Sequence, residues 1–213
     1  MNWMIQTLWS SIGKKLLMAL TGLSFCGFLV GHLAGNLTIY GGKDAFNSYA
    51  EHLHSLGPVL TLMEWGLLAF AVVHICTGLA LFYQNFRART SRYAVSKWAG
   101  GRTIGSATMP YTGILLLVFI ILHLINFHFV DKTNTSIYQI VAQTFENPLY
   151  VVIYILAMIV AGLHVSHGLW SAFQTIGANH LKYMPFIMAL SIIFSLAVGF
   201  GFGIIPIYLS IAG

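Results

Sequence analysis

The sequence predicts an all-α integral membrane protein, a five-transmembrane-helix bundle that forms a single domain over residues 1–213. Three observations indicate this class. Only 7% of the residues are charged, whereas a water-soluble domain carries about 25%. Hydrophobic residues make up 58% of the chain, and its mean hydropathy is +0.81. Five uncharged runs each exceed the roughly 20 residues that an α-helix needs to cross about 30 Å of hydrocarbon.

The five uncharged runs define the expected spans, and Pro and Gly residues mark their ends. The runs cover residues 16–42, 65–86, 103–130, 147–181 and 183–213. Gly41 and Gly42 end the first run, and prolines stand near the start of the later ones: Pro58, Pro110, Pro148 and Pro185. The first run is too long for the apolar part of a cleaved signal peptide, so we expect it to remain as a span.

Two connections on one side of the bundle are expected to hold short interfacial helices. In the segment DAFNSYAEHLHSL, apolar side chains recur at helical spacing after Asp44, which we expect to cap the helix. Residues 135–146 are expected to form a second short helix. No repeat covering the whole chain is evident.

Lys and Arg residues near the span ends set the expected orientation, because they accumulate on the cytoplasmic side of a membrane. Lys43 and Lys132 fall on one side, toward which all five acidic residues lie. The other eight fall on the opposite side: Lys14, Lys15, Arg87, Arg89, Arg92, Lys97, Arg102 and Lys182. We expect a cytoplasmic N-terminus and an external C-terminus. This topology explains the net charge of +5 without a nucleic-acid partner, although the basic face could also dock an acidic partner or anionic membrane lipid.

Four of the nine histidines lie well inside the first four spans, one on each: His32, His74, His123 and His164. The first and third each stand eight residues before the outer end of their span, about 12 Å below it. The second and fourth each stand sixteen residues after the proline that opens their span, about 24 Å below the same level. The four histidines therefore form two pairs at two depths.

Two imidazoles from different helices at one level are the ligand set of a bis-histidine haem, so two depths indicate two haems. A single histidine in a span is more often a hydrogen-bonded interhelical residue, but four at two matched depths favour ligation. A Zn or Cu site would need a tighter cluster with Cys, Asp or Glu. Cys26 and Cys76 lie within apolar stretches, where we expect them to pack as small hydrophobic residues.

Glycines near these histidines favour the same interpretation. The inner histidines share the pattern H-x-x-x-G-L, which leaves room for a flat macrocycle against bare backbone at Gly78 and Gly168. Three glycines at i+4 spacing smooth one face of the first span, although ordinary helix packing explains them equally well: Gly27, Gly31 and Gly35.

Glu64 is the only acidic residue well inside a span, about 9 Å from its outer end. Its carboxyl could exchange protons with a bound quinone, or could be protonated and hydrogen-bonded to a neighbour such as Asn126. His167 could donate to a propionate of an inner haem. His128 could face headgroups or an outer propionate. The remaining histidines are expected to be solvated or interfacial: His52, His54 and His180.

From Lys14 to about Gly203, the chain resembles the cytochrome b subunit of succinate:quinone oxidoreductases, the succinate dehydrogenase and fumarate reductase family, in its five-helix, two-haem form. Five segments carry the resemblance: GHLAGNL around His32, DAFNSYAEHLHSL in the first outer connection, VHICTGL around His74, LHLINFH around His123 and LHVSHGLWSAFQTIG around His164. The last segment is the most specific.

This resemblance implies haem b on all four histidines, His32 with His123 outside and His74 with His164 inside. It also implies a respiratory-chain anchor in the cytoplasmic membrane. The anchor would carry a flavoprotein and an iron–sulfur subunit on its cytoplasmic face, with the loop from Arg87 to Arg102 as a docking surface. Menaquinone would be the quinone. Dicarboxylate chemistry would belong to the flavoprotein, and this chain would carry out only electron transfer and quinone chemistry.

Two other functions stay open at this stage. One is the haem b anchor of a different dehydrogenase, such as a hydrogenase or a formate dehydrogenase. The other is a transporter that uses intramembrane histidines for a metal ion or a proton, although the paired depths and the lack of broken, repeat-related spans argue against it.

Overall fold

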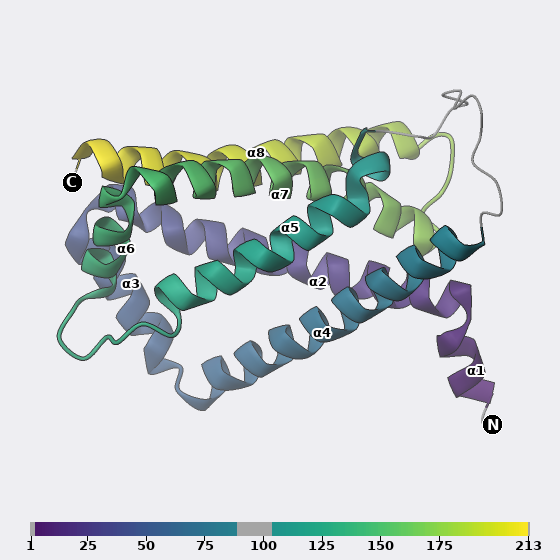
Figure 1. The fold of residues 1–213 in the computed structure, drawn as a ribbon, viewed down its shortest axis with the longest axis horizontal. Coiled ribbons are helices and arrows are strands. Elements are labelled where there is room, and N and C mark those ends of the chain that lie inside the picture. The colour runs from purple at the N-terminus through teal and green to yellow at the C-terminus, as the bar shows by residue number, and fades with distance from the viewer. Residues whose placement is uncertain (1–2, 89–103, 213) are drawn as a thin grey trace.

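The computed structural model describes residues 3–88 and 104–212, and in this part of the chain every regular element is a helix (Figure 1). Five long helices dominate: α2 (Ser11–Leu37), α4 (Pro58–Arg87), α5 (Ile104–Phe127), α7 (Pro148–Thr175) and α8 (Met184–Ala212). Each of the five is long and apolar enough to cross a membrane. The predicted fold class, an all-α multi-pass membrane protein with five spans, is confirmed.

The starts of the long helices follow the expected local chemistry. Proline occupies the first turn of both α4 and α7, where its missing N–H leaves no helical bond unmade. Asn147 caps α7 by accepting a hydrogen bond from the backbone N–H of Leu149. Ser10 caps α2 in the same way, accepting from the backbone N–H of Gly13.

Short helices cover the ends of the bundle. They are α1 (Trp3–Trp9), the 3₁₀ helix η1 (Thr38–Gly41), α3 (Lys43–Ser55) and α6 (Ile137–Glu146). The two short helices expected in the outer connections are therefore present as α3 and α6, whereas α1 was not expected. Asp44 was expected to cap α3, and this is wrong: Gly42, with φ of 88°, holds the cap position, and Asp44 lies in the first turn. There its negative charge interacts favourably with the helix dipole.

Helices α3 and α6 lie together at the end of the bundle that also holds the C-terminus (Figure 1). The backbone N–H of Tyr138 in α6 donates to the Asn47 side chain in α3 over 3.1 Å. Buried apolar side chains from both short helices and from η1, α7 and α8 form one cluster beneath them: Ile39, Phe46, Val141, Phe145, Tyr154, Ile205 and Leu209. This end of the molecule is thus a packed cap.

The long helices are packed unequally. Helix α7 lies against α8 along much of its length and also contacts α5 and α2. Helix α4 packs mainly on α2, touches α5 only lightly, and has no buried residue. The four helices α2, α4, α5 and α7 each carry one of the intramembrane histidines, and α8 lies behind α7 (Figure 1).

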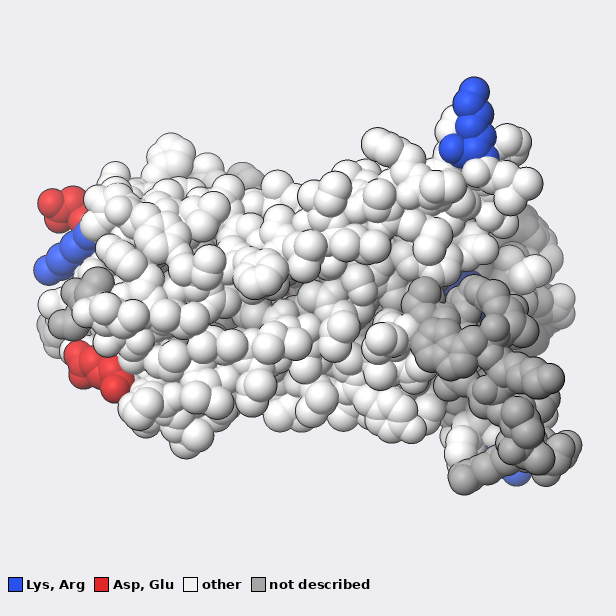
Figure 2. Space-filling view, turned by 90° about the horizontal axis from the view of Figure 1, so that it is seen from above, with Lys and Arg blue, Asp and Glu red and all other residues white. Residues whose placement is uncertain are grey.

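The charged residues separate along the bundle. Figure 2 shows acidic side chains gathered at the α3 and α6 end, with no charged side chain visible across the long middle of this face. Four of the eight basic residues on the opposite side are described at helix ends: Lys14, Lys15, Arg87 and Lys182. The other four lie outside the described residues: Arg89, Arg92, Lys97 and Arg102. We call the two ends the acidic end and the basic end.

Candidate functional site

The four intramembrane histidines form two pairs of neighbouring imidazole rings, each pair joining two helices. His32 on α2 and His123 on α5 have ring centres 5.9 Å apart and ring planes at 87°. His74 on α4 and His164 on α7 have ring centres 6.5 Å apart and planes at 64°. The structure therefore brings the four histidines together in the pairs that their depths indicated, an outer pair and an inner pair.

The spacing within each pair suits a metal ion between the rings. First-row metal ions hold an imidazole nitrogen at about 2.0–2.1 Å, which separates the centres of two opposed rings by about 6 Å. Both observed separations, 5.9 and 6.5 Å, fall close to this value. Among the described residues, no group of three or more His, Cys, Asp or Glu could hold a metal ion. Two opposed imidazoles fit a macrocycle that supplies the remaining ligands, as haem does.

The inner pair has hydrogen-bonding support that the sequence reasoning missed. The Thr21 hydroxyl oxygen on α2 lies 2.9 Å from Nδ1 of His74, and the Thr112 hydroxyl oxygen on α5 lies 3.1 Å from Nδ1 of His164. Each threonine is itself buried. Their spacing could have revealed them: each threonine stands eleven residues, or three helical turns, before one of the outer histidines.

The outer pair lies among aromatic rings. Phe28 stacks on the His32 ring at 5.0 Å, and Phe202 approaches it at 5.4 Å. The rings packed around His123 belong to Phe119, Phe127 and Tyr154. Rings of this kind exclude water from the two imidazoles.

The outer imidazoles have little hydrogen-bonding support. Nδ1 of His123 is buried without a hydrogen-bond partner. Nδ1 of His32 has only the side-chain nitrogen of Asn36 near it, at 3.5 Å. An unsatisfied buried polar atom costs about 1–3 kcal/mol and is typical of a functional site or of a site that takes up a further group.

The glycines near the histidines divide into three kinds. A Cβ added at Gly27 or Gly31 would meet nothing within 4 Å, and both positions are exposed. A Cβ at Gly35 would collide with the Tyr49 ring, so Gly35 serves close packing between α2 and α3. At the two inner glycines, an added Cβ would meet the methyl group of a methionine within 3.5 Å: Met18 at Gly78 and Met109 at Gly168.

Glu64 lies on the exposed side of α4. No hydrogen bond joins Glu64 to Asn126, whose amide donates to the Tyr154 hydroxyl over 3.0 Å. Glu64 is exposed because α4 packs mainly on α2 and has no buried residue. The Glu64 carboxyl therefore lies on the outer surface of the bundle, and an acid within a membrane span is a functional candidate.

The other histidines divide by exposure. His167 lies near the inner pair, and its ring packs edge-on against Trp170 at 4.8 Å. His128 is exposed just beyond the end of α5, where its carbonyl oxygen accepts a hydrogen bond from the Lys132 ammonium. The remaining three are also exposed, as expected: His52, His54 and His180.

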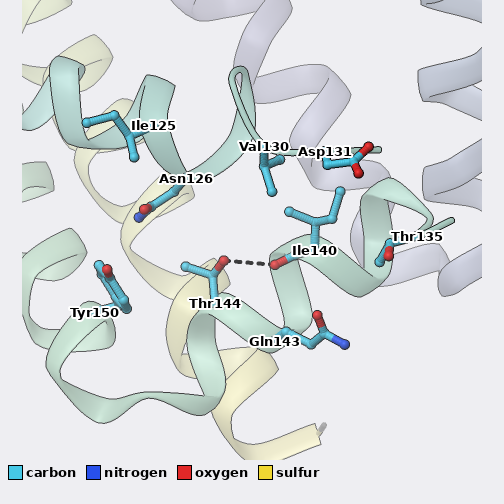
Figure 3. A pocket seen from close by; sticks show the side chains of 9 residues that line it. All are labelled: Ile125, Asn126, Val130, Asp131, Thr135, Ile140, Gln143, Thr144 and Tyr150. Atoms are coloured by element: carbon cyan, nitrogen blue, oxygen red, sulfur yellow. Dashed lines mark hydrogen bonds between the residues drawn. The ribbon is translucent and has the colours of Figure 1, made fainter. Parts of the chain in front are cut away.

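A pocket of about 380 Å³ opens at the acidic end among α5, α6 and α7 (Figure 3). Its lining mixes apolar and polar side chains: Ile125, Asn126, Val130, Asp131, Thr135, Ile140, Gln143, Thr144 and Tyr150. The side-chain hydroxyl and backbone N–H of Thr133 both donate to Asp131 and hold the pKa of that carboxyl below its usual value. Asn126, which lines the pocket, donates a hydrogen bond to the Tyr154 hydroxyl, and the Tyr154 ring packs against His123 of the outer pair.

Comparison with protein-family models, curated proteins and solved structures finds no match to this chain.

Proposed function

We propose that this chain is the di-haem cytochrome b membrane anchor of a succinate:quinone oxidoreductase, acting as a succinate dehydrogenase or a quinol:fumarate reductase. One observation carries the proposal: two opposed imidazole pairs, on four different spans, at separations of 5.9 and 6.5 Å. His32 and His123 would hold the outer haem b, and His74 and His164 the inner one.

The residues of this chain would do three things for such groups. Each pair of imidazoles would hold one haem between two protein ligands, and haem held in this way would supply single-electron transfer. The aromatic rings around the outer pair would keep water away from the ligands. With one haem at each histidine pair, electrons could pass between the two ends of the bundle.

The direction of the chain in the membrane follows from its charges. The protein would lie in the inner (cytoplasmic) membrane. Its basic end would face the cytoplasm, and its C-terminus would lie outside. The flavoprotein and the iron–sulfur subunit would dock on the basic end, where Arg87 ends α4. The rest of the proposed docking loop, up to Arg102, lies outside the described residues.

A quinone, menaquinone on the family resemblance, would react near the outer pair. Glu64 supports this because it is an exposed acid within a span at that level, where it could exchange protons with a quinone lying against α4. His167 would donate to a propionate of the inner haem, one helical turn beyond His164.

The decisive experiment is purification of the native membrane complex with a reduced-minus-oxidised spectrum and a haem count. We expect two haem b per chain, with covalent or bound flavin and iron–sulfur centres in the partner subunits. Nickel or molybdenum in the partners would instead indicate the anchor of a hydrogenase or a formate dehydrogenase. A complex without haem absorbance would contradict the proposal and favour a transporter.

A further inference from the structure

Helices α2 and α5 carry the same pattern of residues, M-x₂-T-G-x₅-F-x₃-H-L, at an offset of 91 residues. Six of the sixteen positions are identical. They are Met18, Thr21, Gly22, Phe28, His32 and Leu33 in α2, and Met109, Thr112, Gly113, Phe119, His123 and Leu124 in α5. The helices that bear the inner histidines, α4 and α7, share the shorter pattern H-x₃-G-L at an offset of 90 residues.

The matching residues make matching contacts with the inner histidines. Thr21 on α2 bonds the His74 ring on α4, as Thr112 on α5 bonds the His164 ring on α7. The glycine that follows each threonine lies beside the same imidazole. A Cβ added at Gly22 or at Gly113 would lie 3.5 Å from Cε1 of that ring.

The other repeated residues also correspond. The methyl group of Met18 lies over Gly78, one turn after His74, and that of Met109 lies over Gly168, one turn after His164. Phe28 and Phe119 each place a ring against the outer histidine four residues later on the same helix, at 5.0 and 5.9 Å. The α2–α4 and α5–α7 helix pairs therefore make corresponding contacts around their histidines.

The direction of the two threonine–histidine hydrogen bonds follows from the single proton of a hydroxyl group. The Thr21 hydroxyl donates to the carbonyl oxygen of Leu17 over 2.7 Å. The Thr112 hydroxyl lies within 3.2 Å of the carbonyl oxygens of Thr108 and Met109. A hydroxyl that gives its single proton to the helix backbone can only accept from the imidazole, so these contacts favour a proton on Nδ1.

We propose that Thr21 and Thr112 are positioning residues for the inner haem: each accepts a hydrogen bond from Nδ1–H of an inner histidine, which orients the ring and leaves Nε2 as the ligating nitrogen. This inference rests on the proposed haem function and deepens it. Hydrogen bonds of this kind fix the tautomer of a metal ligand and raise its basicity. Helices α2 and α5 each supply one such threonine to a histidine on the neighbouring helix, so both histidines proposed for the inner haem would be supported in the same way.

The outer pair provides an internal reference, because neither of its histidines has a threonine hydroxyl at Nδ1. Nδ1 of His123 has no partner, and His32 has only a distant amide. A change at either threonine is therefore expected to affect one haem and not the other. A general loss of packing would not separate the two haems in this way.

The test uses the purified complex with Thr21→Val and Thr112→Val, which keep the side-chain shape and remove the hydroxyl. Loss of the acceptor makes the histidine a weaker donor to iron. We expect the midpoint potential of the inner haem to rise, its electron paramagnetic resonance signal to shift, and its haem affinity to fall on the order of 10–100-fold. The outer haem should keep its wild-type potential and spectrum.

Two controls separate positioning from structure. Thr21→Ser and Thr112→Ser keep the hydroxyl and should behave as wild type. Thr77→Val removes a hydroxyl that donates only to backbone carbonyls on α4, one turn from His74, and it should also leave both haems unchanged. Valine variants whose inner haem keeps its wild-type potential and spectrum would overturn the inference while leaving the haem function intact.

A measurement on the wild-type complex covers the case in which the valine variants fail to assemble. In the reduced, diamagnetic state, proton magnetic resonance should show two slowly exchanging imidazole Nδ1–H protons from the inner ligands. Rapid exchange of both protons would overturn the inference. A wild-type complex without haem would contradict the proposed function itself, so the two failures are distinguishable.

Discussion

The rings of His32 and His123 lie 5.9 Å apart and nearly perpendicular, although 91 residues separate them along the chain. Both helices carry the pattern M-x₂-T-G-x₅-F-x₃-H-L, and the two rings form the outer of two histidine pairs. This relationship makes the four histidines testable as two independent sites.

Replacing any one of the four histidines with alanine should remove one haem and spare the other. His32→Ala and His123→Ala should lose the same spectral component, and His74→Ala and His164→Ala the other, because an iron with one axial protein ligand is held weakly. Reduced-minus-oxidised spectra of the purified complex measure this. His54→Ala, an exposed residue on α3, is the control. A variant with both haems intact would remove its histidine from the ligand set.

Glu64→Gln should impair quinol turnover while both haems remain, because glutamine keeps the shape of the side chain and cannot exchange a proton. Loss of a general acid or base costs typically 10²–10⁴-fold, and we expect a fall of about 10²-fold in kcat. Glu51→Gln, an exposed acid on α3, should leave turnover unchanged. Wild-type turnover in Glu64→Gln would exclude the proton-exchange role.

Gly35→Ala should destabilise the acidic end, since a Cβ there would lie 2.4 Å from atoms of the Tyr49 ring. Overpacking of this kind costs roughly 1–3 kcal/mol. Thermal denaturation in detergent would show a lowered midpoint. The double variant Gly35→Ala with Tyr49→Leu should recover part of the loss, and Gly27→Ala, where an added Cβ meets nothing within 4 Å, should not lower the midpoint. Equal losses in Gly27→Ala and Gly35→Ala would contradict this account.

Asn126→Leu should lower stability by about 1–3 kcal/mol, because the partly buried Tyr154 hydroxyl would lose its donor beside His123. Gln143→Leu changes the same pocket without touching that hydrogen bond, and its thermal midpoint should stay at the wild-type value. Identical midpoints for the two variants would show that the Asn126–Tyr154 bond contributes nothing.

Much of the fold could be predicted because it depends on local composition. Uncharged runs of sufficient length identified all five spans, and the prolines located the starts of α4 and α7. Polar connections with helical periodicity identified α3 and α6. The cap of α3 was misassigned, because Asp44 is a good cap by type and Gly42 has the positive φ that the turn before the helix adopts.

The sequence by itself determined which segments cross the membrane and how deep each histidine lies, because length and helical rise are properties of one helix alone. Only the tertiary structure decided that Thr21 meets His74, that Asn126 meets Tyr154 and that Glu64 faces outward. These facts depend on the rotation of each helix about its own axis. A span that is apolar on every side carries little facial pattern to indicate that rotation, so packing against neighbouring helices sets it.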